Sequence, residues 1–263
     1  MDSIVGERDI VIVTGCNAVG KTTASNYLRK LARSHRVPYE NRIISDSQCL
    51  FQAMLEDDKD GGLHHTHNWC ENTTTGHTHN FDQPSFPFTI TDNELPDRMR
   101  HYFFPKLETL PRTGNLWFAE WAAGVNTNPP ENLISRVDYS YKKINYLLRE
   151  GDIPSTWLKR VKVVFHLKAD YDVRRFLNEQ RTIPSFARPE ALEQGTASWL
   201  KDERVLRFYG DDDFFEIDSI LLNANIPIYT VTNNGGPEFF NLLENTAKSL
   251  FSSSPVEPVL IPA

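Results

Sequence analysis

Residues 15–22 read GCNAVGKT and match the phosphate-binding pattern G-x-x-x-x-G-K-[ST]. Residues 9–14, DIVIVT, precede this loop as a β-branched apolar run that is too short for a helix and hydrophobic enough for a buried parallel strand. Residues 22–31 follow with apolar side chains at helical spacing, so a helix should begin where the loop ends. A strand, a glycine-containing loop and a helix N-terminus together present main-chain N–H groups and a positive dipole to an anion.

This context favours binding of a nucleoside triphosphate over a chance match in a loop that binds nothing. Lys21 would contact the β- and γ-phosphates, and Thr22 would place its hydroxyl group on Mg²⁺. The residues of the loop and the helix start that we expect to contact the nucleotide are Gly15, Asn17, Ala18, Val19, Gly20, Lys21, Thr22 and Thr23.

Length and composition fit one globular α/β domain with insertions. The 263 residues are 40% hydrophobic, which is enough for a sizeable core. The net charge of −7 gives no overall basic field for nucleic acid or a membrane surface, although a local basic groove is compatible with it. We expect no membrane-spanning segment and no signal peptide, and three cysteines suit reduced thiols in the cytoplasm. The oligomeric state stays open, a homodimer included.

Acidic residues follow two further predicted strands. Asp46 comes directly after the strand 41–45, and Glu120 comes directly after the strand 115–119. Ligands of open α/β sheets bind at the carboxyl ends of the strands, so both residues are candidates for contacting the acceptor. Asp46 or Ser47 can cap a helix over 48–55, and Asp46 can also be a general base that takes a proton from an acceptor hydroxyl; the two roles of Asp46 are compatible. Glu120 either holds Mg²⁺ and orients the attacking group or only pairs with an arginine.

Three arginines follow the fourth predicted strand, 161–167, on a helix over 170–181. Arg174 and Arg181 are seven positions apart and therefore share a helix face, and Arg175 stands beside Arg174. Guanidinium groups in this position suit the clamping of a transferring phosphoryl group, whose charge is spread over three oxygens. We expect Arg174 and Arg181 to be catalytic and Arg175 to contact the nucleotide, and the alternative is a solvated helix face.

Residues 56–92 interrupt the alternation of strands and helices. This segment contains the near-duplicate HTHNW (65–69) and HTHNF (77–81). Neighbouring histidine and cysteine residues suggest zinc, but the spacing fits neither CxxC nor HExxH. We expect instead a pocket that stacks on and hydrogen-bonds a small polar acceptor, with a metal site or a solvated loop as the alternatives. The residues assigned to this pocket are His65, His67, Trp69, His77 and His79.

The order of these features resembles the nucleoside and nucleotide kinase branch of P-loop proteins. It comprises the phosphate loop, Asp46 after the second strand, Glu120 after the third, the arginine helix after the fourth, and Asn233 after a fifth strand over 226–232. The resemblance implies a three-layer P-loop NTPase fold, with a five-stranded parallel sheet in the order 2-3-1-4-5 and helices on both faces. It also implies a lid over about 170–213 and an adenine pocket near Asn233. The kinase domain would span residues 1–251, and the proline-containing tail 252–263 would be irregular.

The same resemblance implies an ATP- and Mg²⁺-dependent phosphotransferase. The γ-phosphate would pass to a hydroxyl or phosphate of a nucleoside-like or other small polar acceptor. The histidine-rich segment 56–92 departs from the pattern of small kinases where they hold the acceptor. Alternatives are a kinase of polynucleotides or DNA bases, a regulatory NTPase, and a nucleotide-binding module without chemistry. The guanine-specifying N-K-x-D signal is absent from residues 232–235, which lowers the GTPase alternative.

Overall fold

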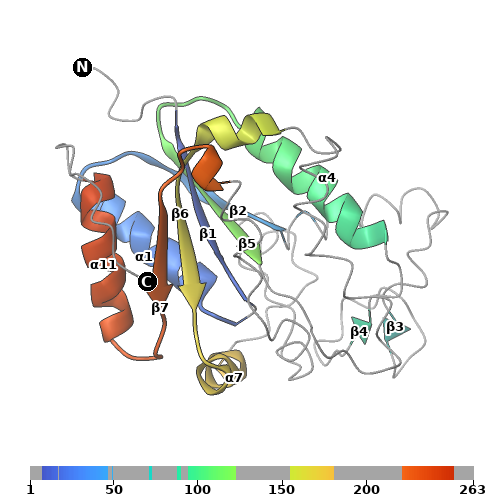
Figure 1. The fold of residues 1–263 in the computed structure, drawn as a ribbon, viewed down its shortest axis with the longest axis vertical. Helices are drawn as coiled ribbons and strands as arrows, with labels where there is room; N and C mark the ends of the chain where they lie inside the picture. Colours follow the sequence, from blue (N-terminus) through green and yellow to red (C-terminus); the bar gives the residue numbers. More distant parts are fainter. Residues whose placement is uncertain are drawn as a thin grey trace.

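The computed structural model of the protein describes residues 8–16, 18–46, 49, 71–72, 88–89, 94–122, 155–180 and 221–251. Its centre is an all-parallel sheet with the strand order β2-β5-β1-β6-β7 (Figure 1). Numbered along the chain, the five strands have the order 2-3-1-4-5, so the predicted P-loop NTPase fold is confirmed. The strands are β1 (Ile10–Gly15), β2 (Tyr39–Ser45), β5 (Leu116–Ala122), β6 (Val161–Lys168) and β7 (Ile228–Thr232).

The central strand β1 is buried along its whole length. It pairs with β5 on one side and with β6 on the other, and helices cover both faces of the sheet. A strand in this position reads as a continuous apolar run rather than as an alternating pattern. The central place of β1 brings the loop that follows it to the middle of the carboxyl edge of the sheet.

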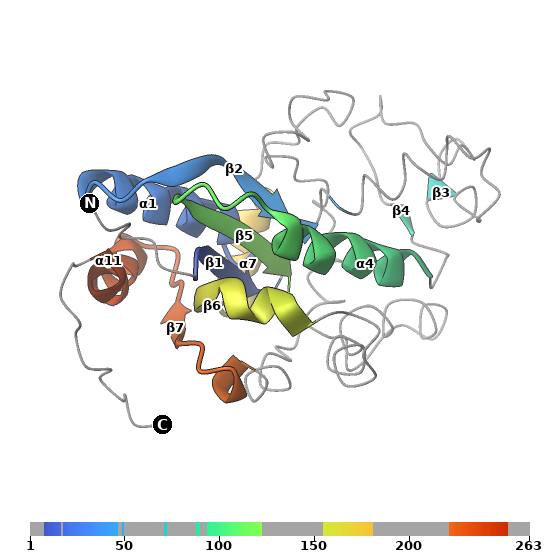
Figure 2. The same cartoon turned by 90° about the horizontal axis from the view of Figure 1, so that it is seen from above.

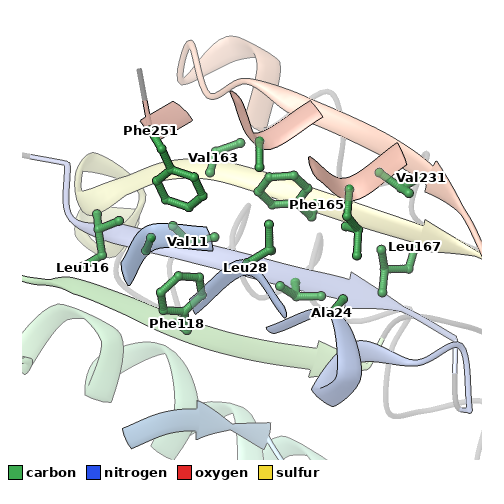
Figure 3. Packing of buried hydrophobic residues seen from close by; sticks show 14 of the residues in the cluster. Val11, Ala24, Leu28, Leu116, Phe118, Val163, Phe165, Leu167, Val231 and Phe251 are labelled. Atoms are coloured by element: carbon green, nitrogen blue, oxygen red, sulfur yellow. The ribbon is translucent and has the colours of Figure 1, made fainter. Parts of the chain in front are cut away.

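Two helices, α1 (Lys21–Ser34) and α11 (Glu238–Phe251), cover one face of the sheet. Alternate residues of the strands point to this face, among them Val11 and Phe118, and pack around Leu28 of α1 (Figure 3). The hydroxyl group of Tyr27 donates a hydrogen bond to Glu244 of α11 over 3.1 Å. The ring of Tyr27 also lies 4.9 Å from the ring of Phe240, centroid to centroid. The helix that begins at the loop is therefore packed against the last described helix.

The other face is covered by α4 (Glu94–Thr109) and by η1 (Ser155–Arg160), which lie side by side in Figures 1 and 2. Phe104 of α4 contacts Trp121 of β5 edge-on and Trp157 of η1, with ring centroids 5.7 Å and 4.8 Å apart. Large aromatic side chains of this kind supply much of the buried area that holds a helix to a sheet. The prediction of helices on both faces is confirmed.

A buried ion pair connects α4 to the start of β1. Arg160 donates two hydrogen bonds to the carboxylate of Asp9, over 3.0 Å and 2.6 Å, and both side chains are 4% exposed. The Nη1 atom of Arg160 also donates to the main-chain carbonyls of Leu107 (3.0 Å), Glu108 (2.8 Å) and Leu110 (2.6 Å). The last carbonyls of a helix have no partner within the helix, so one guanidinium group satisfies the end of α4 and the carboxylate together.

The remaining described elements are short. Helix α7 (Tyr171–Glu179) follows β6, and β3 (Glu71–Asn72) pairs with β4 (Phe88–Thr89) as a small antiparallel ladder. None of the described helices has the length and the apolar character needed to cross a membrane. Most of the helix predicted over 48–55, most of the segment 56–92, the lid beyond residue 180 and the tail 252–263 lie outside the described residues. The domain limits stay a prediction.

Candidate functional site

The loop between β1 and α1 lies at the carboxyl edge of the sheet and is closed by two glycines. Gly15, the last residue of β1, has φ of +142°, and a Cβ atom there would lie 2.4 Å from the carbonyl oxygen of Leu167 on β6. Gly20 has φ of +95° and directly precedes α1. Side chains at either position would be strained by the backbone conformation and would meet a neighbouring segment. The glycines let the chain turn sharply from a buried strand into a helix, and Asn17 between them lies outside the described residues.

Positive charge is concentrated at this turn. The first turn of α1 carries no acidic side chain of its own, so the helix itself does not neutralise the positive end of its dipole. Lys21 Nζ donates hydrogen bonds to the carbonyl oxygens of Gly15 (3.1 Å) and Cys16 (3.0 Å). These bonds hold the ammonium group against the loop. The arrangement suits the binding of an anion such as a phosphate group.

Glu120 is buried beside the start of α1. Its side chain projects from β5 toward α1, and its Oε2 atom accepts a hydrogen bond from the hydroxyl group of Thr22 over 2.8 Å. The residue is 4% exposed. Burial raises the pKa of Glu120, while the hydroxyl groups of Thr22 and Ser25 and the ammonium group of Lys21 act in the opposite direction. The Oε1 atom has no hydrogen-bond partner among the residues that the structure describes.

Asp46 lies at the same edge of the sheet. Ser45 at the end of β2 is the register partner of Glu120 on β5, and Asp46 follows Ser45 directly. Asp46 is 4% exposed, and its carboxylate contributes to the raised pKa of Glu120. Two buried carboxyl groups from neighbouring strands therefore converge next to the loop. The sequence predicted this convergence, because parallel strands end at one edge of the sheet.

The residues beside the loop fit a magnesium ion. Mg²⁺ prefers oxygen ligands and is usually held by one or two carboxylates together with the phosphates of a substrate. The Thr22 hydroxyl group and the buried Oε1 atom of Glu120 without a hydrogen-bond partner supply oxygen atoms of this kind. In the described part of the chain, no group of three or more histidine, cysteine, aspartate and glutamate side chains could hold a metal by itself. A magnesium ion at this position would therefore need further ligands, which water and the phosphates of a substrate can supply.

The arginines of α7 have different environments. Helix α7 lies beyond the carboxyl end of β6, at the edge of the sheet that carries the loop (Figure 1). Arg174 is 3% exposed, with its guanidinium carbon 5.9 Å from the centre of the Tyr171 ring. The side chain of Arg175 is half-exposed and lies 3.7 Å from Asp172 Oδ1. Arg181 and the five predicted acceptor residues of the histidine-rich segment lie outside the described residues, so their roles stay predictions.

Two residues beside the loop make contacts that the sequence did not indicate. Ser25 is fully buried one turn beyond Thr22 and lies close enough to Glu120 to lower its pKa. Its position three residues after Thr22, on the same helix face, is the signal that would have found it. Asn233 donates a hydrogen bond from Nδ2 to the carbonyl oxygen of Val19 over 2.9 Å. It therefore contacts the loop itself, and its predicted contact with the nucleotide stays a prediction.

Comparison with known proteins gives matches among solved structures but none among family models or curated proteins. No protein-family model matches the chain, and no curated protein matches it in sequence. Among solved structures, TT1252 from Thermus thermophilus covers 93% of this chain and 98% of its own length, with 15% identity and a TM-score of 0.39. Shikimate kinase from Acinetobacter baumannii, solved in complex with shikimate, covers 92% of this chain and 93% of its own, with 14% identity and a TM-score of 0.38. The fold assignment therefore rests on the strand order and the loop described above.

Proposed function

We propose that the protein is a Mg²⁺-dependent phosphotransferase that moves the γ-phosphate of ATP to a hydroxyl or phosphate group of a small polar, nucleoside-like acceptor. The observation that carries this proposal is the convergence of Lys21, Thr22, Glu120 and Asp46 at the loop between β1 and α1. Phosphoryl transfer requires positioning and neutralisation of charge more than covalent chemistry by the protein, and these four residues supply both.

The loop and Lys21 would bind the triphosphate. Main-chain N–H groups at the start of α1 would cradle the phosphates, and the Lys21 ammonium group would contact the β- and γ-phosphates. The bonds of Lys21 to the carbonyls of Gly15 and Cys16 already hold this group against the loop.

Thr22 and Glu120 would hold the magnesium ion. When bound, Mg²⁺ supplies neutralisation of the negative charge on the β- and γ-phosphate oxygens. The Thr22 hydroxyl group would contact the ion, and Glu120 would hold it directly or through water. Burial raises the pKa of Glu120, so a nearby divalent ion would stabilise its ionised form.

Asp46 would act on the acceptor. For a hydroxyl acceptor, Asp46 would take the hydroxyl proton while the acceptor oxygen forms a bond to the γ-phosphorus atom. The bond between that phosphorus and the β-γ bridging oxygen breaks, and ADP leaves with the electron pair. Arg174 and Arg181 would stabilise the charge on the transferring group. The histidines and aromatic rings of residues 56–92 would hold the acceptor.

The experiment that tests this proposal follows the γ-phosphate of ATP to its product. ATP labelled at the γ-phosphate is offered with Mg²⁺ to nucleosides, nucleotides, sugars and oligonucleotides, and the product that carries the label is identified. Label in a small acceptor, lost in a Lys21→Ala variant, supports the proposal. Label only in inorganic phosphate indicates an NTPase. Label in oligonucleotides, with affinity that falls steeply as salt rises, indicates a polynucleotide kinase. A chain that binds ATP and leaves it intact is a binding module.

A further inference from the structure

The turn after β7 is tied to the phosphate-binding loop by a single buried side chain. Asn233 directly follows β7 and is 4% exposed. Its Nδ2 atom donates to the carbonyl oxygen of Val19 over 2.9 Å, and its Oδ1 atom accepts from the main-chain N–H of Gly235 over 2.9 Å. Its own main-chain N–H donates to the carbonyl oxygen of Lys168 over 2.7 Å. Both ends of the amide are engaged, so the side chain has one orientation.

The loop is shaped to receive this side chain. A Cβ atom added to Gly20 would lie 2.8 Å from Asn233 Nδ2, closer than such a contact allows. Gly20 is therefore glycine for two reasons, its φ of +95° and the amide that occupies the space beside it. The close fit means that the loop and the turn after β7 hold each other in place.

The bond to Val19 also fixes a direction inside the loop. A trans peptide group is planar, and its C=O and N–H bonds point in opposite directions. Because the carbonyl group of Val19 points toward Asn233, the N–H of Gly20 must point away from it. A loop that binds phosphate needs its N–H groups turned to one side and its carbonyl groups satisfied on the other.

We propose that Asn233 is a positioning residue that pre-orients the phosphate-binding loop for the triphosphate. This inference rests on the proposed function, because it concerns the same nucleotide site. It differs from the contact with adenine predicted from the sequence, since Asn233 acts here through the carbonyl group of Val19. Without this bond the peptide between Val19 and Gly20 rotates more freely, and binding must restrict it again.

Asn234 provides a matched control at the next position. Its Oδ1 atom accepts from the main-chain N–H of Gly236 over 3.0 Å, in the same local turn that Asn233 makes with Gly235. It is exposed, and among the residues that the structure describes its Nδ2 atom contacts Glu238 Oε2 alone, at 3.4 Å. Serine in place of either asparagine keeps an oxygen for the local turn, while its shorter side chain carries no amide donor. Only Asn233→Ser therefore removes a bond to the loop.

The experiment measures ATP affinity and loop exchange in the full-length chain. The dissociation constant for ATP is determined by calorimetry with Mg²⁺ and no acceptor. Amide hydrogen exchange without nucleotide is followed in peptides that cover residues 15–24 and 238–251. We expect Asn233→Ser to raise the dissociation constant by about 3- to 10-fold, the equivalent of one hydrogen bond. Exchange should quicken in residues 15–24 and stay unchanged in residues 238–251. Asn234→Ser should alter none of these quantities.

Other outcomes separate this inference from the proposed function. Equal affinity and equal exchange in the wild type and Asn233→Ser would overturn the inference and leave the kinase proposal standing. Faster exchange throughout α11 as well would also overturn it, since the role of Asn233 would then be general stability. If the wild type binds ATP but transfers no phosphate, the proposed function fails while the effect of Asn233→Ser on affinity still supports the positioning role. If the wild type binds no ATP, both are wrong.

Discussion

Replacing Glu120 with glutamine should make the nucleotide-free protein more stable and the phosphotransferase less active. The carboxylate is 4% exposed, and burial raises its pKa above the ordinary value of 4.5. The fold therefore disfavours the ionised form. Glutamine has the same shape, and its amide oxygen can accept the hydrogen bond that Thr22 donates to Oε2 over 2.8 Å. The substitution removes the buried charge while it keeps the contact.

The sign and size of the stability change follow from linkage. A carboxyl group whose pKa is higher in the native state contributes stability that is lost as the pH rises from 4.5 through the native pKa. Above that window, the wild type loses about 1.4 kcal/mol for each unit by which its pKa is raised. Glu120→Gln has no proton to lose, so its stability should be greater at pH 7 to 8 and less dependent on pH.

The same substitution should lower the phosphotransferase activity. A neutral amide cannot offset the charge of a magnesium ion, and removal of such a partner typically costs about 10- to 100-fold in metal affinity or activity. Unfolding by urea between pH 5 and 8 and turnover titrated with MgCl₂ measure the two effects. Glu179→Gln, an exposed carboxylate of α7, is the control that should change neither. A Glu120→Gln variant that is less stable throughout this range, or fully active at low Mg²⁺, would refute the reasoning.

Three further substitutions test other parts of the structure. Lys21→Ala should abolish phosphate transfer from labelled ATP because it removes the cation held at the loop. Lys30→Ala, on the exposed side of α1, is the control and should leave transfer unchanged. Full activity of the Lys21→Ala variant would end the kinase proposal. Asp46→Asn should lower kcat by roughly 10²- to 10⁴-fold if Asp46 is the base, and a drop of only a few fold would leave it a structural residue. Arg160→Met should cost about 3 to 5 kcal/mol in urea unfolding, because it leaves the buried Asp9 carboxylate and the end of α4 without their partner. A loss below about 1 kcal/mol would show that this ion pair is exposed to solvent in practice.

The strands could be predicted because each is a short run of apolar, often β-branched residues in the sequence. The residues at which the strands end were harder to predict. The strand predicted over 115–119 stops before the charged Glu120, whereas β5 continues to Ala122. The sequence gives a charged residue no reason to lie inside a buried strand. The structure supplies one, since the hydroxyl group of Thr22 on α1 meets the carboxylate. A contact between residues 98 positions apart carries no periodicity that a sequence window can detect.

The candidate site was predictable to the extent that strand ends meet at one edge. That rule places both Asp46 and Glu120 at the carboxyl edge of the sheet from the sequence alone. It could not find the bond from Asn233 to Val19, which spans 214 positions. Nor could it separate Arg174 from Arg175, because one position along a helix turns a side chain by about 100° and only packing decides which one is buried. The structure buries Arg174 and leaves Arg175 half-exposed.

The packing of α1 against α11 has a consequence for synthesis of the chain. The helix that begins at the nucleotide loop shares its buried face with the last described helix, through Tyr27, Glu244 and Phe240. Domains fold as units while the ribosome extends the chain from its N-terminus. The side of α1 that packs on α11 therefore stays uncovered until residue 251 has left the exit tunnel. A ribosome stalled before α11 would hold a nascent chain that carries the loop and α1 but lacks the helix that covers this side of α1.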